Sequence, residues 1–287
     1  MPADRRHFRR ALVEKRTKEG SVESAALRDQ INDLEAKLQA LTSKLSAAPT
    51  EKASSSVKPP VRLLGFDFDC TLTVRHFYKV FAWGYLSGNA ASHPHYQEFV
   101  AWCKERGIDP AAVRGEADMD RDFMAKALDD FTRRNGEEAF SKLFRELFLG
   151  GEDRIRSLAQ WLERLDAKGV QFAIITAGTS TAVLRGLNCA PELRRFIPSS
   201  RVWDCSQGRH SIRSVMGQKV LILRDLCPEA SGIVLVDDSF PKDTPPSWAP
   251  AAAGVTLFEG LPYEGPGLSG DLLEQVEKEI LKGATAE

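Results

Sequence analysis

Two aspartates, two positions apart, close an apolar stretch in the first quarter of the chain. The stretch reads LLGFDFDCTLT from Leu63 to Thr73, and the two acids are Asp67 and Asp69. Side chains two apart on a strand point to the same side, so a strand here would bring both carboxylates together. Adjacent carboxylates repel each other unless one is protonated or a cation lies between them. A hard cation such as Mg²⁺ takes oxygen ligands, so it would meet that need and could neutralise a bound phosphate as well. Paired acids at a strand end are also common on protein surfaces.

Further polar residues follow later apolar stretches in the same way. They are a hydroxyl after FAII, an acidic group after IVLV and an ammonium in GQKVLILRDL: Thr176, Asp237, Asp238, Asp243 and Lys219. Lys242 is an alternative source of the ammonium group. The carboxyl ends of parallel strands meet at one edge of a sheet, which is where α/β proteins bind ligands. A hydroxyl, an ammonium and several carboxylates at one edge indicate a phosphate site with its metal.

The elements that must position these residues alternate between strands and helices. Apolar segments predict strands over residues 61–68, 170–176, 201–204, 233–237 and 254–258. Amphipathic segments predict helices over residues 154–168, 217–226 and 271–281. Continuous apolar strands separated by helices are typical of a parallel sheet with both faces covered. The predicted fold class is therefore α/β, with a doubly wound parallel sheet of the Rossmann-like kind.

A long interval interrupts this alternation after the first strand. It is predicted to hold helices over residues 94–106, 116–134 and 137–149. The last of these has a strongly apolar face, formed at helical spacing by Phe140, Leu143, Phe144, Leu147 and Phe148. We therefore predict a helical insert over residues 75–150, whereas residues 61–74 and 151–287 form the sheet domain.

The segment before the first strand has three parts. Residues 1–20 are basic and are interpreted as a frayed terminus, with an organelle-targeting segment or an anion-binding patch as alternatives. Residues 21–46 carry a 4-3 apolar repeat at Leu27, Ile31, Leu34, Leu38, Leu41 and Leu45. That repeat predicts a coiled-coil helix, and we favour homodimerisation through it over packing on its own domain. Residues 47–60 are rich in Ser, Ala and Pro and are predicted to be a linker.

Composition limits the partners and the compartment. Apolar residues make up 43% of the 287 residues and charged residues 28%, and the net charge is -1. These values are ordinary for a globular protein and give no indication of nucleic-acid or membrane binding. The five cysteines are scattered without a CxxC pair, which favours a reducing compartment. We therefore expect a cytoplasmic protein, with no nucleic acid and no membrane among its partners.

The order of these motifs resembles the haloacid dehalogenase superfamily, and within it the phosphatase branch. The resemblance extends over residues 61–261. The first motif of that family is D-x-D-x-T after an apolar strand, and FDFDCTLT matches it. The second, third and fourth motifs are a strand-end Ser or Thr, a Lys and an acidic pair, matched by Thr176, Lys219 and the VDDS segment at 236–239.

The resemblance implies a role for each matched residue. Asp67 would be the nucleophile that forms an aspartyl-phosphate, and Asp69 would be the general acid and then the general base. The phosphate oxygens would be held by Thr176, the Ala177 amide and Lys219. Mg²⁺ would be bound by Asp67, the Asp69 carbonyl and Asp238, with Asp237 and Asp243 as further candidates.

The implied function is a Mg²⁺-dependent phosphomonoesterase acting on a small phosphorylated metabolite. The insert would be a helical C1-type cap, and Arg75, His76 and Tyr78 are candidates for substrate contact or for packing. A phosphomutase using the same site is one alternative. A non-catalytic interaction protein that assembles through residues 21–46 is another, although the complete set of motif residues argues against it.

Overall fold

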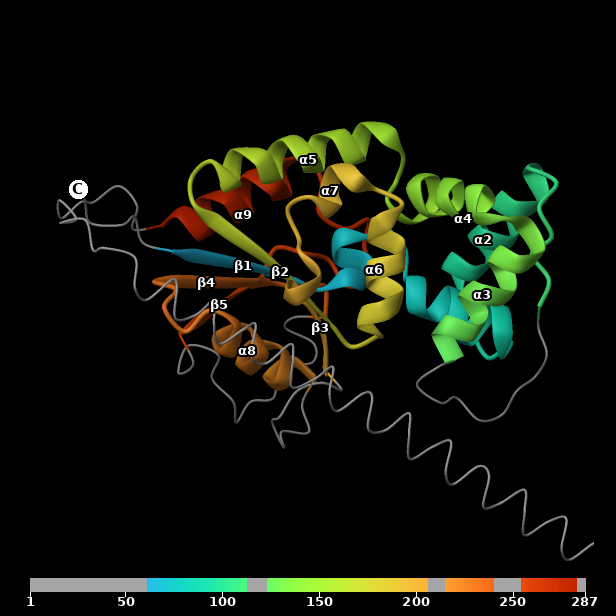
Figure 1. The fold of residues 1–287 in the computed structure, drawn as a ribbon, viewed down its shortest axis with the longest axis horizontal. Coiled ribbons are helices and arrows are strands. Elements are labelled where there is room, and N and C mark those ends of the chain that lie inside the picture. The colour runs from blue at the N-terminus through green and yellow to red at the C-terminus, as the bar shows by residue number, and fades with distance from the viewer. Residues whose placement is uncertain (1–60, 113–122, 206–214, 240–253, 283–287) are drawn as a thin grey trace, which may run out of the picture. The chain divides into compact units, whose positions relative to one another are not determined.

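The structure is a computed structural model, and it describes residues 61–112, 123–205, 215–239 and 254–282 (Figure 1). The predictions for residues 1–20, 21–46 and 47–60 lie outside the described residues. So do Lys242 and Asp243. In the part of the chain that is described, no helix is long and apolar enough to cross a membrane.

A five-stranded parallel sheet forms the centre of the fold, in the order β3-β2-β1-β4-β5 (Figure 1). The strands are β1 (Arg62–Phe66), β2 (Val170–Thr176), β3 (Val202–Asp204), β4 (Gly232–Val236) and β5 (Val255–Phe258). Every residue of β1 is buried, as expected of a central strand covered on both faces. The predicted α/β fold with a parallel sheet is confirmed.

Helices cover the two faces of the sheet (Figure 1). Leu64 and Phe66 of β1 pack in one apolar cluster with α5 (Glu152–Asp166) and α9 (Asp271–Leu281). Leu63 points to the opposite face and packs in a second cluster with α8 (Val215–Leu226). Between β2 and β3 the chain forms α6 (Ser180–Asn188), α7 (Pro191–Arg194) and the 3₁₀ turn η4 (Ser199–Arg201). This alternation along β1 gives the doubly wound arrangement.

The insert forms a separate group of helices beyond the end of the sheet (Figure 1). Its elements are the π-helix η2 (Lys79–Leu86), α2 (Pro94–Glu105), α3 (Phe123–Asn135), α4 (Glu137–Leu143) and the π-helix η3 (Phe144–Phe148). Phe81 lies at its centre and contacts six other aromatic rings, with centroid distances of 5.3–6.3 Å. The only buried charged residue among the described residues of the insert is Asp130, which accepts a hydrogen bond of 2.8 Å from the Tyr85 hydroxyl.

The two connections between insert and sheet domain lie side by side. The Val74 N–H donates to the Phe148 carbonyl over 2.7 Å, which joins the outgoing connection to the returning one. The guanidinium of Arg154 donates to three main-chain carbonyls, those of Leu72, Leu149 and Leu268, over 2.8–3.1 Å. One side chain of α5 therefore holds both connections and the segment before α9.

Candidate active site

The first motif leaves the sheet earlier than predicted. Strand β1 ends at Phe66 rather than at residue 68, and Asp67 continues in extended backbone, with its N–H donating to the Val236 carbonyl over 2.8 Å. Asp69 lies in the turn η1 (Phe68–Leu72), which reverses direction at Cys70 with φ 56°. The expectation that both carboxylates project from one strand was therefore wrong. The position of Asp69 is set by the turn η1 and not by the alternation of side chains along a strand.

Two threonines hold this turn in place. The Cys70 N–H donates to the Thr73 hydroxyl over 3.1 Å, and that hydroxyl lies 3.0 Å from the Phe68 carbonyl. The Thr71 hydroxyl accepts a hydrogen bond of 3.1 Å from the Asp238 N–H, across 167 positions of sequence. The threonine of the D-x-D-x-T pattern therefore joins the first motif to the fourth.

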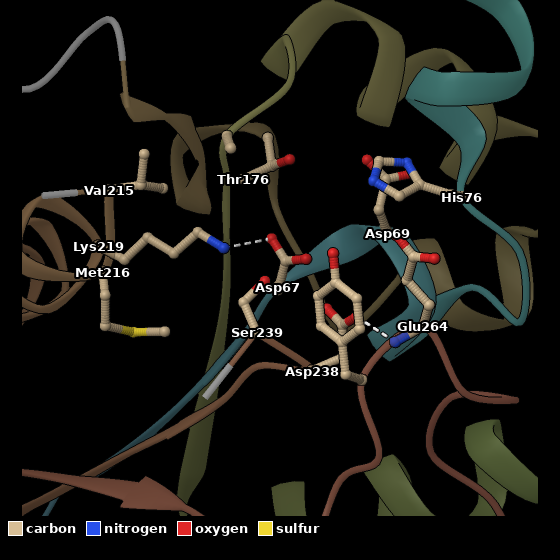
Figure 2. Close-up of a pocket in the computed structure, with 12 residues that line it drawn as sticks. Asp67, Asp69, His76, Thr176, Val215, Met216, Lys219, Asp238, Ser239 and Glu264 are labelled. Carbon is tan, nitrogen blue, oxygen red and sulfur yellow. Dashed lines mark hydrogen bonds and ion pairs between the residues drawn. The ribbon is translucent and has the colours of Figure 1, made fainter. Parts of the chain in front are cut away.

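Lys219 extends from helix α8 to the first motif. Its side chain, in α8, is only 3% exposed, and its ammonium lies 2.7 Å from Asp67 Oδ1 (Figure 2). The same ammonium lies 2.5 Å from Asp237 Oδ2. Burial alone would lower the pKa of Lys219, but the charges of Asp237 and Asp67 outweigh it and raise the pKa. Lys219 is therefore a fixed cation beside the predicted nucleophile.

Three carboxylates lie close enough to share one cation. Oxygen atoms of Asp67, Asp237 and Asp238 all lie within 4.8 Å of one another, and all three residues are buried. Burial raises the pKa of Asp67 to about 8, and Lys219 only partly opposes this. Burial also raises the pKa of Asp238 to about 6. The cluster is short of positive charge and offers hard oxygen ligands, which is the donor set that suits Mg²⁺.

Asp69 is surrounded by three consecutive residues of the insert. Its Oδ1 accepts a hydrogen bond of 3.1 Å from the Tyr78 N–H and lies 3.5 Å from His76 Nδ1, and the Phe77 N–H also interacts with the carboxylate. Burial would raise the pKa of Asp69, but the charge of His76 and these hydrogen bonds outweigh it, so the pKa is lowered. The ring of His76 therefore lies next to the predicted general acid.

A group that sequence reasoning missed contacts the acidic cluster through Asp238. The Glu264 N–H donates to Asp238 Oδ2 over 2.8 Å, and the Glu264 carboxylate forms an ion pair with Lys79 of the insert. His93 Nε2 lies 3.6 Å from the same carboxylate. Burial would raise the pKa of Glu264, but the hydrogen bond and charge of Lys79 lower it to about 2. No motif or spacing in the sequence indicates the contact between Lys79 and Glu264, because the two residues are 185 positions apart.

These groups meet at a cavity of about 170 Å³ (Figure 2). It is lined by Asp67, Asp69, His76, Thr176, Ala177, Val215, Met216, Lys219, Asp238, Ser239, Tyr263 and Glu264. Six of the predicted site residues are in that lining. Asp237 lies behind it, with its side chain 0% exposed, and its Oδ1 accepts from the Ser239 N–H over 2.9 Å. Asp243 lies outside the described residues.

Thr176 and Ala177 reach this cavity from the end of β2. The Thr176 hydroxyl accepts a hydrogen bond of 3.0 Å from the Gly178 N–H, which fixes the side chain in the turn that follows the strand. Thr176 is buried and Ala177 is exposed. The strand-end hydroxyl and the following residue therefore both line the cavity.

Comparison with known families agrees with this geometry. Residues 61–245 match the model of the haloacid dehalogenase-like hydrolases. This match covers more than half of the chain, and the protein belongs to that family of hydrolases. The predictions of the family and of an enzyme are confirmed.

Comparison with solved structures gives distant similarities. One is to a phosphoserine phosphohydrolase-like protein from Francisella tularensis subsp. tularensis SCHU S4, at 15% identity and a TM-score of 0.32, covering 63% of this chain and 79% of that one. Another is to cytosolic 5'-nucleotidase IIIB bound to cytidine, at 14% identity and a TM-score of 0.34, covering 77% of this chain and 86% of that one. No curated protein sequence matches the chain. Similarities this distant say nothing about the substrate.

Proposed function

We propose that the protein is a Mg²⁺-dependent phosphomonoesterase that acts on a small phosphorylated metabolite through an aspartyl-phosphate on Asp67. One observation carries the proposal. Asp67 and Asp69 line the same cavity of about 170 Å³, and the ammonium of Lys219 lies 2.7 Å from Asp67. A nucleophile, an acid and a phosphate-binding cation thus face one space, which is what an in-line transfer of a phosphoryl group requires.

In the first half-reaction the phosphate lies against Lys219, the Thr176 hydroxyl and the Ala177 amide. A carboxylate oxygen of Asp67 attacks phosphorus, and the bond from phosphorus to the leaving oxygen breaks. Asp69 must be protonated in the substrate complex, although its pKa is lowered in the site without substrate, and it gives this proton to that oxygen, so the product leaves as an alcohol. Fixed charges around the phosphate stabilise the transition state without having to reorient during the reaction.

In the second half-reaction the same two aspartates act on water. The Asp69 carboxylate takes a proton from the water molecule, whose oxygen attacks phosphorus. The bond between phosphorus and Asp67 breaks, and inorganic phosphate leaves. Asp67 ends as a carboxylate and Asp69 ends protonated, which is the state in which the cycle began.

The acidic cluster is proposed to hold Mg²⁺. Asp67, Asp238 and the Asp69 carbonyl are the proposed ligands, and Asp237 is assigned a supporting role because Lys219 and the Ser239 N–H already occupy its oxygens. Bound Mg²⁺ would supply the positive charge that the three carboxylates and the phosphate need.

The insert, residues 75–150, is proposed to act as a cap over this site. Residues 61–74 and 151–287 are proposed to supply the chemistry. The cap reaches the cavity through His76, the only described residue of 75–150 in its lining. We propose that the cap chooses the substrate and excludes water.

The amide variants of the two aspartates test the proposal. Asp67→Asn removes the attacking oxygen, so neither phosphate release nor a phosphoenzyme is expected with any substrate. Asp69→Asn keeps the nucleophile and loses the acid. Turnover of an alkyl phosphate should fall by about 10²–10⁴-fold, whereas p-nitrophenyl phosphate should still phosphorylate Asp67, because its leaving group needs little protonation.

Mass spectrometry provides the measurement. After Asp69→Asn is mixed with p-nitrophenyl phosphate and Mg²⁺, the peptide containing residues 65–73 should carry one added phosphate, because no base activates water. Asp153→Asn is the matched control, since Asp153 is a solvent-exposed aspartate of α5 and should leave turnover unchanged. Turnover that persists in Asp67→Asn, with no adduct in Asp69→Asn, would show that the two acids have other roles.

A further inference from the structure

Glu264 has a backbone conformation that is unusual for its residue type. Its φ is 48°, and it and Cys70 are the two non-glycine residues with positive φ among the described residues. Left-handed backbone is sterically disfavoured for a side chain such as glutamate, and it persists where the surroundings hold it. Cys70 lies in the turn that places the proposed general acid. Glu264 lines the same cavity.

Both ends of Glu264 are engaged, and they bind different parts of the molecule. Its backbone N–H donates to Asp238 Oδ2, a proposed Mg²⁺ ligand, over 2.8 Å. Its carboxylate pairs with Lys79 and lies 3.6 Å from His93 Nε2, and both of these residues belong to the cap. The side chains of Lys79 and Glu264 are 18% and 26% exposed, so water only partly screens their attraction.

The two cap residues that hold Glu264 are themselves fixed. Lys79 begins η2, and its N–H lies 3.3 Å from His76 Nδ1. His93 is the N-cap of α2, where its ring accepts a hydrogen bond of 3.2 Å from the His95 N–H. The Glu264 carboxylate is thus attached to the starts of two cap helices.

We propose that Lys79 and Glu264 are positioning residues that link the cap to the Mg²⁺ site. The contact of Lys79 with the Glu264 carboxylate holds the left-handed backbone, and that backbone presents the N–H that orients Asp238. The position of the cap then sets the affinity of the site for Mg²⁺. This inference rests on the proposed function, because it requires Asp238 to bind the metal.

Whether substitution of Lys79 weakens or strengthens Mg²⁺ binding distinguishes a positioning role from a purely electrostatic one. Lys79 lies outside the lining of the cavity, and removing a positive charge near a cation site should strengthen Mg²⁺ binding by Coulomb attraction alone. If Lys79 acts through Glu264 and Asp238, its removal should weaken binding. Substitution of residues that orient metal ligands typically weakens metal affinity by about 10–100-fold.

The experiment measures Mg²⁺ binding to the full chain by titration calorimetry, with no substrate present. Lys79→Met is expected to raise the dissociation constant for Mg²⁺ about tenfold. Lys79→Arg, which keeps a cation within reach of Glu264, should restore most of the affinity. Arg75→Met is the matched control, because Arg75 is a cap cation next to His76 that pairs with Glu98 and not with Glu264. It should leave the dissociation constant unchanged or lower it.

Three outcomes decide between the proposals. Weaker binding in Lys79→Met, rescue in Lys79→Arg and no weakening in Arg75→Met support the link. Equal or tighter binding in Lys79→Met, while the wild-type protein binds Mg²⁺, overturns the link and leaves the proposed function intact. A wild-type protein that binds no Mg²⁺ overturns the proposed function itself.

Discussion

The edge of the sheet and the interior of the cap are built from opposite kinds of residue. At the sheet edge, four buried aspartates and one buried lysine lie together: Asp67, Asp69, Asp237, Asp238 and Lys219. Inside the cap, aromatic rings surround Phe81, and Asp130 is the only buried charged residue that is described there. The sheet edge thus holds several buried charges close together, whereas the interior of the cap is apolar.

This difference separates catalytic chemistry from stability. Burying carboxylates near one another opposes folding, and the raised pKa values of Asp67 and Asp238 reflect that opposition. Apolar packing favours folding in proportion to the area removed from water. We therefore expect changes at the sheet edge to act mainly on turnover, and changes inside the cap to act mainly on the free energy of unfolding.

Removal of Mg²⁺ should give the largest effect on turnover, because the proposed metal ligands lie at the sheet edge. If the proposed Mg²⁺ site is correct, chelation with EDTA is expected to reduce phosphate release by about 10³-fold or more, because the acidic cluster would then lack its proposed cation. Phosphate release is measured before and after addition of excess Mg²⁺, which should restore it. Near-ultraviolet circular dichroism of the aromatic residues should not change. A spectral change on chelation would show that the aromatic packing inside the cap also depends on the metal, which the contact of Lys79 with Glu264 at the surface of the cap does not require.

Substitution of Phe81 tests whether the aromatic interior of the cap contributes to stability and not to turnover. Phe81→Ala removes a buried ring that contacts six others, so the free energy of unfolding should fall by about 3–5 kcal/mol. Urea denaturation monitored by circular dichroism gives this value, and Phe81→Leu should show a smaller loss. At low temperature, where the variant stays folded, turnover of p-nitrophenyl phosphate should remain close to wild type. Lost turnover without lost stability would contradict the separation.

The smallest expected effect concerns Asp130, the one buried acid among the described residues of the cap. Tyr85→Phe removes a hydrogen bond of 2.8 Å to Asp130, whose carboxylate keeps its ion pairs with Arg133 and Arg134. The loss should be about 1 kcal/mol of unfolding free energy. Tyr96→Phe is the matched control, and it should change the unfolding free energy by much less. A loss of several kcal/mol in Tyr85→Phe would mean that Asp130 depends on the hydroxyl.

Long apolar periodicity made much of the fold predictable. The bounds predicted for 170–176 and 271–281 agree with β2 and α9 residue for residue, because burial on both faces of a strand and on one face of a helix leaves a regular pattern. The end of β1 was predicted two residues late. The positive φ of Cys70 that ends the extended backbone has no signal in sequence, since cysteine rarely adopts it.

The part of the site that follows strand ends could be predicted from topology, whereas Asp69 and Lys219 were assigned through the resemblance of the motifs. Thr176 ends β2, Asp67 directly follows β1, and Asp238 comes two residues after the end of β4, so topology alone brings them to one edge. Glu264 and Lys79 could not be found in this way. Their contact depends on how the cap meets the turn after β5, and no local pattern in a single sequence records such a long-range contact.

The central place of β1 has a consequence for how the protein is made. This strand pairs with β2 and β4, and both follow it in the chain with the cap in between. At about 5–20 residues per second, roughly 100 residues must be synthesised before β2 appears, which takes about 5–20 s. The cap helices make local contacts and can fold during that delay. During that time the apolar side chains of β1, those of Leu63, Leu64 and Phe66, lack the neighbouring strands that bury them in the folded protein. We therefore expect β1 to be a binding site for a ribosome-associated chaperone.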